Sequence, residues 1–429
     1  MKRYPEYKES GVKWIGEIPA HWKIEKIKHI ATLVSEKSTP EAGTIKISPE
    51  NVESKTGKIL DFYSSYDSSG VKFQVGDVLF NKIRVYLNKV VFAEYDGYSL
   101  GEMVVMRPSL QSMGKYLFYF MLSSRFIEYC DSISYGAKMP RTAVDDILNA
   151  QIPITSDKEQ RQIANFLDQK TGKIDELIRI KERQIELFHE QRTALINQSV
   201  TKGLDPNVEM KPSGVEWIGE IPAHWEIIKL RYLGVLQNGI SKDSDSFGLG
   251  YPFLSYGDVY NNETLPLQVE ELVKSTKADR ERYSVLERDV FFTRTSETIE
   301  DIGISSTCMK TIENCVFSGF LIRFRNTSKI LTKELSKYYF SSHLPRIFLA
   351  REVNIVTRSS LSQESLKRLP VLLPPVDEQK EIAMFLDEQT SKIDAMTKKE
   401  NKQIQLLQEY RQSLISEAVT GKIDVRNEV

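Results

Sequence analysis

The sequence predicts an α+β fold in which two mixed α/β domains form a pseudo-twofold internal repeat and are separated by two long antiparallel coiled-coil helices. Two repeated motifs and a change of pattern predict this fold. An opening motif, SGVKWIGEIPAHW at residues 10–22, returns as SGVEWIGEIPAHW at 213–225. A closing motif, EQRQIANFLDQKTGKIDELI from Glu159, returns as EQKEIAMFLDEQTSKIDAMT from Glu378. Between the motifs the chain has the pattern of short strands, whereas each closing motif leads into the apolar spacing of a helix.

The repeat sets the domain boundaries. Trp217 minus Trp14 gives an offset of 203, and Asp387 minus Asp168 gives 219, so the second copy has gained 16 residues in its middle. The prediction is a first domain, a first long helix, a second domain and a second long helix, at residues 1–156, 157–205, 206–376 and 377–429.

The diverged part of each domain, about 23–156 and 226–376, is called the first and the second insert. Weak matches survive between them, with GDVLFNK from Gly76 against RDVFFTR from Arg288. Short runs rich in β-branched and aromatic residues predict strands within 71–80, 88–93, 103–106, 285–292 and 317–324. Helices are predicted within 115–129 and 332–349. A constant frame that holds two diverged inserts indicates two related tasks on two different targets.

Aromatic clusters lie in both predicted insert helices, at residues 118–120 and 338–340. They could serve as platforms on which nucleic-acid bases stack. Their helical spacing among other apolar residues favours the simpler interpretation, which is core packing.

The two long helices need a packing partner. Residues 157–202 contain no proline and one glycine, and about 40 helical residues at 1.5 Å each span roughly 60 Å. Apolar residues recur at steps of three and four in both copies, so we predict that the helices pack together as a coiled coil and that this seam docks partner proteins. The predicted seam residues are Ile174, Ile178, Ile185, Phe188, Leu195, Ile393, Ile404, Leu407 and Leu414.

Charged residues interrupt this seam at equivalent repeat positions. Lys181 and Glu400 share one position, and Arg192 and Arg411 share another. They could fix the register of the helices at some cost in stability. The favoured interpretation is that their long side chains extend to the rim and keep their charges in water.

Composition limits the possible classes of protein. The chain has 429 residues, of which 41% are hydrophobic, and a net charge of -1, so any nucleic-acid binding must come from local patches. No apolar run is long enough for a membrane span, and the start of the chain does not resemble a signal peptide, so we expect a cytoplasmic protein. Cys130, Cys308 and Cys315 form no C-x-x-C pair, and we expect reduced, buried thiols.

Catalytic motifs are missing from the sequence. Gly11 and Gly16 have the spacing of a phosphate loop, but Glu17 follows where lysine is needed. We also find no glycine-rich loop for S-adenosylmethionine. His21 and His224 lie in the duplicated His-Trp pairs, but neither has a cluster of metal-binding residues around it in the sequence. We therefore predict no catalytic residue and no metal site, and a packing role for both histidines.

Positive charge collects instead in a few loops of the inserts. In the first insert, Lys82, Arg84 and Lys89 lie in NKIRVYLNK, and Lys138 and Arg141 lie in a later loop. The matching segments of the second insert are FTRTSE, with Arg294 and Ser296, and TRSS, with Arg358 and Ser359. Such loops contact phosphates and base edges in DNA-binding proteins, and we predict that these residues bind DNA. Solvated surface loops have a similar composition, so the pattern alone leaves both interpretations open.

The frame resembles the DNA-specificity subunit of type I restriction-modification enzymes. The resemblance rests on W-I-G-E-I-P-x-x-W, on G-D-V-L-F, and on E-Q-x-x-I-x-x-F-L-D followed by K-I-D and a long helix, and it covers nearly the whole chain. It implies that each insert is a target-recognition domain that reads one half of a split site on double-stranded DNA. It also implies that the helices form a spacer that docks methyltransferase subunits, two of them by the symmetry of the repeat.

By the same resemblance, this chain binds no cofactor and catalyses no reaction. S-adenosylmethionine, ATP and magnesium would belong to partner methyltransferase and restriction motor-nuclease subunits. Two other classes stay open. One is a coiled-coil adaptor without DNA specificity, which would not need two diverged inserts. The other is part of a fused methyltransferase or nuclease, which would need catalytic motifs that the sequence lacks.

Overall fold

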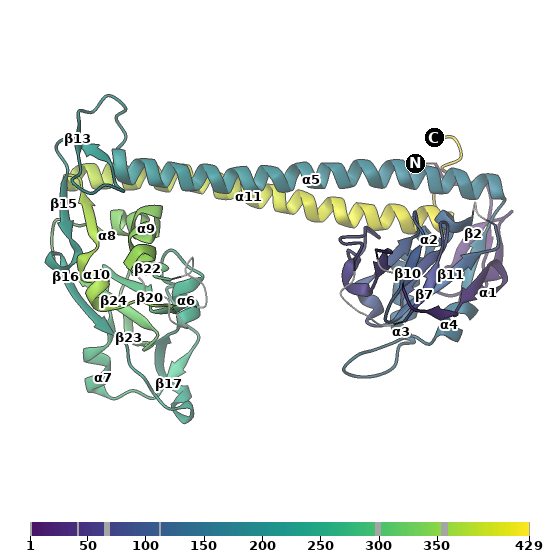
Figure 1. The fold of residues 1–429 in the computed structure, drawn as a ribbon, viewed down its shortest axis with the longest axis horizontal. Helices are drawn as coiled ribbons and strands as arrows, with labels where there is room; N and C mark the ends of the chain where they lie inside the picture. Colours follow the sequence, from purple (N-terminus) through teal and green to yellow (C-terminus); the bar gives the residue numbers. More distant parts are fainter. Residues whose placement is uncertain are drawn as a thin grey trace. The chain divides into compact units, whose positions relative to one another are not determined.

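A computed structural model describes residues 2–40, 43–63, 69–110, 113–296, 302–352 and 359–428. The chain forms two compact units (Figure 1). The first contains Met1–Arg183 and Glu400–Val429, and the second contains Gln184–Lys399. Each unit therefore combines one insert with a part of both long helices.

The first insert is built on two four-stranded sheets. One has the order β4, β11, β8, β9, with bounds Ala31–Val34, Met103–Pro108, Val78–Asn81 and Val90–Phe92, and all its pairs are antiparallel. The other has the order β5, β7, β10, β6, with bounds Lys37–Ser38, Gly70–Phe73, Gly97–Ser99 and Lys46–Ile47. Short pairs flank these sheets, namely β1 (Tyr7–Glu9) with β2 (Glu17–Pro19), and β3 (Lys23–Lys26) with β12 (Gln151–Ile154). The helices are α1 (Ile27–Ile30), α2 (Met113–Leu122), α3 (Ser124–Ser132) and α4 (Val144–Asn149), with short 3-10 turns η1 (Pro49–Asn51) and η2 (Val85–Leu87).

The second insert repeats this plan. Its first sheet has the order β16, β24, β20, β22, with bounds Gly234–Asn238, Leu321–Asn326, Asp289–Thr293 and Ser305–Thr307. Its second has the order β18, β17, β23, β19, with bounds Leu272–Val273, Phe247–Leu254, Ile312–Phe317 and Ser284–Val285. The short pairs are β13 (Met210–Pro212) with β14 (Glu220–Pro222), β15 (Glu226–Lys229) with β26 (Pro370–Leu373), and β21 (Thr295–Ser296) with β25 (Ser359–Ser360). The helical segments are α6 (Tyr256–Tyr260), α7 (Lys277–Arg282), α8 (Lys333–Ser341), α9 (His343–Glu352), α10 (Gln363–Arg368), η3 (Leu230–Tyr232) and η4 (Ser244–Ser246).

One ion pair across the first sheet explains the weak sequence match between the inserts. Asp77 of GDVLFNK accepts two hydrogen bonds from Arg107, at 2.9 and 2.8 Å. The second insert makes the same pair between Asp289 and Arg325, at 2.9 and 2.6 Å. Both aspartates are buried, so the paired arginine is needed to offset the cost of removing the carboxylate from water.

The predicted strands and helices of the inserts are confirmed in type, but several are divided by tight turns. The run at 71–80 becomes β7 and β8, because Asp77 accepts a hydrogen bond from the backbone of Gln74 and closes a turn between them. The helix predicted at 115–129 becomes α2 and α3, because Ser123 caps a new helix. The aromatic clusters at 118–120 and 338–340 are buried, which confirms core packing.

The long helices are α5 (Asp157–Lys202) and α11 (Val376–Val419). In the first unit they run antiparallel, since Asp175 contacts Arg411 and Lys181 contacts Glu400. In the second unit the same two helices contact each other through Arg192 and Asp394. Among the predicted seam residues, Ile174, Ile393 and Leu414 are buried, and Ile178, Ile185, Phe188, Leu195, Ile404 and Leu407 are half-buried.

The second helix ends earlier than the predicted range of 377–429. It stops at Val419, and Gly421 then adopts a left-handed conformation with φ of 69°. A Cβ atom at Gly421 would lie 2.3 Å from Pro19 Cδ and 3.2 Å from Trp22. The chain can therefore turn there only because glycine lets it pass against the opening motif, and Asp424 then pairs with Lys2.

The prediction that the charged seam residues extend to the rim is wrong. Arg411 is buried and donates hydrogen bonds to Asp175 at 2.9 Å and to the carbonyls of Lys55 and Thr56. Arg192 donates to Glu263 at 2.6 and 2.7 Å. Each helix arginine thus holds the insert of the other copy, because Arg411 belongs to the second copy and Lys55 to the first.

The duplicated His-Trp pair joins the two ends of each copy. His21 Nε2 lies 2.9 Å from Glu159 Oε2, and the indole of Trp22 donates to the same carboxylate at 3.3 Å. In the second copy His224 and Trp225 contact Glu378 at 2.8 and 3.1 Å. The tryptophans are buried, whereas both histidines are hydrogen-bonded but exposed, so the packing is done by the tryptophans.

Candidate nucleic-acid interface

Two loops of the first insert lie side by side and form what we call the first loop pair, residues 81–87 and 134–142. The backbone nitrogen of Arg84 donates to the carbonyl of Pro140 at 2.7 Å, and that of Thr142 donates to Lys82 at 2.9 Å. Ile83 also forms a bridge with Arg141. The structure therefore brings together four predicted DNA-binding residues, Lys82, Arg84, Lys138 and Arg141, from segments far apart in sequence.

Cationic side chains of the first loop pair remain accessible. Arg84 and Lys138 are exposed and Arg141 is half-buried, and within the part of the chain that the structure describes their side chains have no hydrogen-bond or ion-pair partner. Lys82 instead pairs with Glu102 at 2.9 Å. Three cations with free donors on a tethered loop are suited to phosphate oxygens or base edges.

The backbone at Arg84 is held in an uncommon conformation. Arg84 has φ of 48° and Asn88 has φ of 49°, both in the left-handed region that residues other than glycine rarely adopt. Asn81 stabilises this turn by accepting a hydrogen bond from the nitrogen of Ile83 and donating to its carbonyl. Such strain is typical of functional sites, where the surrounding structure fixes a side chain in one direction.

Lys89 does not belong to this group. Its ammonium donates a hydrogen bond to the carbonyl of Pro49 at 2.7 Å, and its side chain is half-buried. One of its three donors is therefore occupied inside the insert, and contact of Lys89 with DNA stays a prediction.

The second insert brings together the equivalent segments as the second loop pair, residues 294–296 and 359–361. β21 pairs with β25, so that Ser296 faces Ser359, and the nitrogen of Leu361 donates to the carbonyl of Arg294 at 2.8 Å. The guanidinium of Arg294 lies 3.4 Å from the carbonyl of Gly319. For Ser296 and Ser359 only the backbone is described, and Arg358 lies outside the described residues.

Bulky apolar side chains accompany the basic ones in both inserts and were missed in the sequence. Tyr135 and Met139 of the first loop pair are exposed, the tyrosine by 58%. Phe320 of the second insert is 63% exposed, and its carbonyl accepts a hydrogen bond from the nitrogen of Arg294. A large hydrophobic residue inside a polar loop is the signal that could have revealed them, since such side chains contact thymine methyl groups and base faces.

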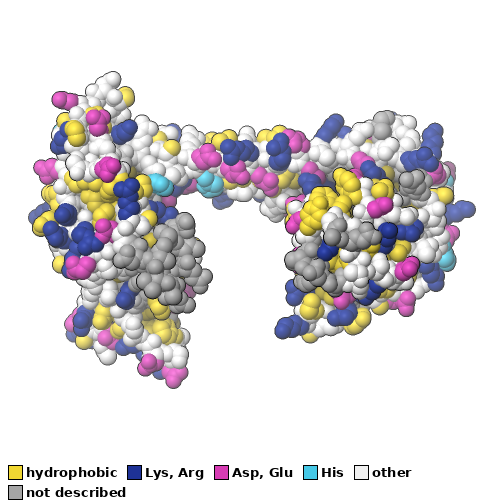
Figure 2. All heavy atoms as spheres, viewed as in Figure 1, with side chains coloured by type: hydrophobic (Ala, Val, Ile, Leu, Met, Phe, Trp, Pro, Cys, Tyr) yellow, Lys and Arg dark blue, Asp and Glu magenta, His cyan; other side chains and the backbone are white. Residues whose placement is uncertain are grey.

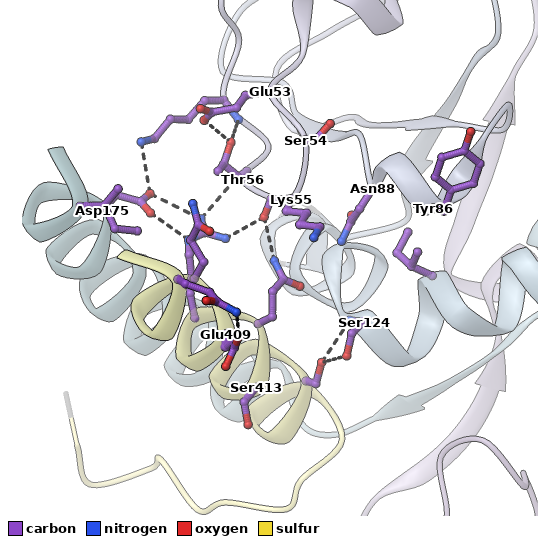
Figure 3. Close-up of a pocket in the computed structure, with 18 of the residues that line it drawn as sticks. Glu53, Ser54, Lys55, Thr56, Tyr86, Asn88, Ser124, Asp175, Glu409 and Ser413 are labelled. Atoms are coloured by element: carbon purple, nitrogen blue, oxygen red, sulfur yellow. Dashed lines mark hydrogen bonds and ion pairs between the residues drawn. The ribbon is translucent and has the colours of Figure 1, made fainter. Parts of the chain in front are cut away.

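A groove of about 1440 Å³ lies in the first unit between the insert and both long helices (Figure 3). Figure 3 shows Asp175 and Glu409 on the helices and Lys55 and Asn88 on the insert side. Its lining contains eight carboxylates and five basic side chains, so its net charge is negative. The groove therefore does not suit the negatively charged DNA backbone.

Surface charge agrees with a local interface. Figure 2 shows Lys and Arg side chains interspersed with Asp and Glu over the visible face, with no single large basic area. Among the described residues, no group of three or more His, Cys, Asp or Glu side chains is placed to hold a metal ion. No helix in the described ranges is long and apolar enough to span a bilayer. Burial raises the pKa of the Cys308 and Cys315 thiols to about 12, so neither is a ready nucleophile.

The fold and the loop pairs define a duplicated protein in which two similar inserts, each with one basic loop pair, share a helical frame. Comparison with known proteins identifies its family. The family model of the type I restriction modification DNA specificity domain matches residues 19–187 and 222–406. The chain therefore belongs to the family of type I restriction-modification specificity subunits.

Relatives support this assignment, one of them over nearly the whole chain. The chain is 24% identical to the putative type I restriction enzyme MjaX specificity subunit of Methanocaldococcus jannaschii, with 98% of both chains covered. It is 26% identical to the EcoKI specificity subunit of Escherichia coli, covering 74% of this chain and 68% of that one.

Solved structures share the fold. A chain from a study of complex assembly and conformational transition of the type I R-M system aligns with a TM-score of 0.73 at 17% identity, covering 95% of this chain and 99% of that one. The HsdS subunit from Thermoanaerobacter tengcongensis aligns with a TM-score of 0.51 at 16% identity, covering 95% and 98%.

Proposed function

We propose that this chain recognises a DNA site made of two half-sites, one through each insert, and holds methyltransferase and restriction subunits at that site. The observation that carries the proposal is the loop pair, which both inserts build on the same backbone contacts with different side chains. A shared scaffold with different exposed groups is what two readers of two base sequences need.

Partner docking is assigned to the outer flank of the long helices. The seam side chains pack between the helices, so a partner would meet other residues. Apolar side chains are exposed at equivalent repeat positions, with Leu177 matching Met396 and Leu187 matching Leu406. Figure 2 shows hydrophobic side chains on the helices among charged ones. Because each exposed pair occurs in both copies, we propose two equivalent docking sites for two methyltransferase subunits.

Catalysis is assigned to the partners. Methyl transfer would use S-adenosylmethionine on the methyltransferase subunits, and restriction would use ATP and magnesium on the motor-nuclease subunits. The role of this chain is to position the DNA and the partners, and the resemblance to proteins named specificity subunits supports this division.

Insert exchange tests the recognition proposal. Residues 23–156 are replaced by the corresponding insert of a relative, and methylated sites are mapped in cells that contain the partner subunits. One half of the methylated sequence should change, while the other half and the spacer between them stay the same. Unchanged methylation, or a change in both halves, would contradict the assignment of one half-site to each insert.

Two double variants test the docking proposal. Leu177→Glu with Leu406→Glu places charges on the outer flank, and co-purification of methyltransferase subunits should fall at least tenfold. Lys173→Glu with Lys392→Glu is the control, because both lysines are exposed equivalent positions of the same helices. Equal loss in both variants would mean that charge alone, and not the apolar positions, governs docking.

A further inference from the structure

A charged contact occupies the middle of the helix pair in the first unit. Lys181 Nζ lies 2.7 Å from the carboxylate of Glu400 and also donates a hydrogen bond to Gln403. The side chains of Lys181 and Glu400 are only 20% and 16% exposed, so both charges are largely removed from water. Because 400 minus 181 equals the repeat offset of 219, Glu400 is the repeat counterpart of Lys181. The contact therefore joins two residues that occupy the same position in the two copies of the repeat.

Another polar contact of the seam has a different relation to the repeat. Arg411 contacts Asp175 in the first unit, and Arg192 contacts Asp394 in the second. Since 411 minus 192 and 394 minus 175 both equal 219, this is one contact made twice. Both helices carry the arginine and the aspartate, so either helix could supply either partner.

Most apolar seam positions are equally interchangeable. Ile174 and Ile393 share one position, as do Leu195 and Leu414, and both members of each pair are apolar. These positions provide no means of telling one long helix from the other, and among the predicted seam residues only Ile178 has a polar counterpart, Thr397.

This symmetry offers an alternative assembly to the chain. In the same antiparallel register, α5 of one molecule could pair with α5 of a second copy, and Asp175 of each would meet Arg192 of the other. Position 181 would then face itself, so two Lys181 ammonium groups would meet between the α5 helices and two Glu400 carboxylates between the α11 helices. Like charges with little access to water repel strongly, and a single polar position is enough to decide which coiled-coil helices pair.

We propose that Lys181 and Glu400 select pairing of α5 with α11 against a swapped dimer in which α5 pairs with α5 and α11 with α11 of a second copy. Lys181 and Glu400 each meet an opposite charge only when α5 pairs with α11, and for this reason the pair favours that combination. Its contribution is to exclude the α5 helix of a second copy from α5, and its α11 helix from α11, and this role is independent of DNA binding.

Mixed refolding of the full chain measures this selection. Two copies with different affinity tags are unfolded together in urea at equal concentration and refolded, and the second tag is quantified after capture through the first. Wild type and the charge-swapped Lys181→Glu with Glu400→Lys should both give low co-capture. Lys181→Leu with Glu400→Leu, which removes the repulsion in the swapped pairing, should raise it about tenfold, with dimers visible by light scattering.

Single and surface variants complete the design. Lys181→Glu alone opposes two carboxylates in every pairing, so it should lower the thermal midpoint without raising co-capture. Lys173→Leu with Lys392→Leu adds the same apolar groups at exposed equivalent positions and should stay at the wild-type level. If the leucine pair does not refold, Lys181→Gln with Glu400→Gln is measured in its place, since it is neutral in both pairings. Co-capture equal to wild type in the neutral seam variant, or an equal rise in the surface control, would overturn the proposal.

Discussion

In the first insert the turn at Gly101–Glu102 presents a carboxylate that pairs with Lys82 at 2.9 Å, whereas the matching turn of the second insert presents Phe320, which is exposed. The backbone beneath these side chains is the same. The nitrogen of Lys82 donates to the carbonyl of Glu102, and the nitrogen of Arg294 donates to that of Phe320. A fixed backbone contact therefore carries an ion pair in one copy and an exposed aromatic ring in the other.

The contacts toward the helices differ far less. Tyr119 donates a hydrogen bond to Asp168 at 2.7 Å, and Tyr338 donates to Asp387 at 2.5 Å. The Asp77–Arg107 pair likewise has its equivalent in the second sheet. Residues that attach an insert to its helix are thus the same in both copies, whereas residues at the loop tips differ between the copies. This separation lets a recognition surface diverge without loss of the fold.

At one cross-strand position the second insert has a buried charged residue where the first insert has an apolar one. Val105 faces Val34 in the first insert, and Arg323 faces Gln237 in the second. Arg323 is buried, donates to the carbonyl of Ser284 at 2.6 Å and lies over the ring of Phe317. Burial lowers the pKa of Arg323 to about 10, but the guanidinium stays charged at neutral pH.

The largest expected effect on stability comes from placing an arginine at the equivalent position of the first insert. Val105→Arg places a guanidinium among apolar side chains that offer it no acceptor, and should destabilise the first unit by about 4 kcal/mol. Arg323→Val with Gln237→Val removes both polar partners together and should change the stability of the second unit by less than about 1 kcal/mol. Urea unfolding followed by circular dichroism measures both. Similar losses in the two variants would show that the interiors are not interchangeable in this way.

A smaller difference is expected between the two helix arginines. Arg411→Met removes hydrogen bonds to Asp175 and to two backbone carbonyls inside the first unit, and should cost about 3 kcal/mol. Arg192→Met removes contacts to Glu263 and Asp394, whose side chains are well exposed, and should cost about 1 kcal/mol. Thermal unfolding provides the comparison, with Arg179→Met as an exposed control. The reverse order would mean that the carboxylate of Glu263 holds its insert more firmly than carbonyl oxygens do.

The free energy of DNA binding should depend on the loop-tip difference between Phe320 and Glu102. The expected change is similar to or smaller than the stability changes given for the helix arginines. Phe320→Ala should weaken recognition of the second half-site by about 1 to 3 kcal/mol, because an exposed ring beside Arg294 is placed to contact a base face or a thymine methyl group. Glu102→Ala, the matched change in the first insert, should leave the second half-site unaffected. Competition binding with each half-site altered in turn separates these effects. Loss on unrelated DNA as well would show that Phe320 contributes no sequence preference.

The sequence predicted the frame better than the interface for a physical reason. Repeats and apolar spacing are local, so the helices and the buried aromatic clusters could be inferred from residue order, whereas the contact of His21 with Glu159 joins residues far apart in the chain. The partner of a long charged side chain depends on three-dimensional proximity, and for that reason the prediction for Arg411 was wrong and the hydrogen bond of Lys89 to Pro49 was not foreseen. Pairing of the two loops around Ile83 and Arg141 is likewise a contact between segments far apart in the chain.

The smallest expected effect is a pH dependence at the junction of the first copy. Burial disfavours ionisation of Glu159, but hydrogen bonds from Thr155 and His21 outweigh it, and the pKa lies below its ordinary value of 4.5. A carboxyl group with a lowered pKa in the folded state stabilises the protein fully above the unfolded value, and this contribution is lost as the pH falls through the folded value. Glu159→Gln should therefore lower the thermal midpoint at pH 7, and its difference from wild type should narrow only as the pH falls from 4.5 toward 3. Glu378→Gln is the matched change in the second copy. A difference between wild type and Glu159→Gln that is constant over this range would show that packing and not the charge of Glu159 holds the junction together.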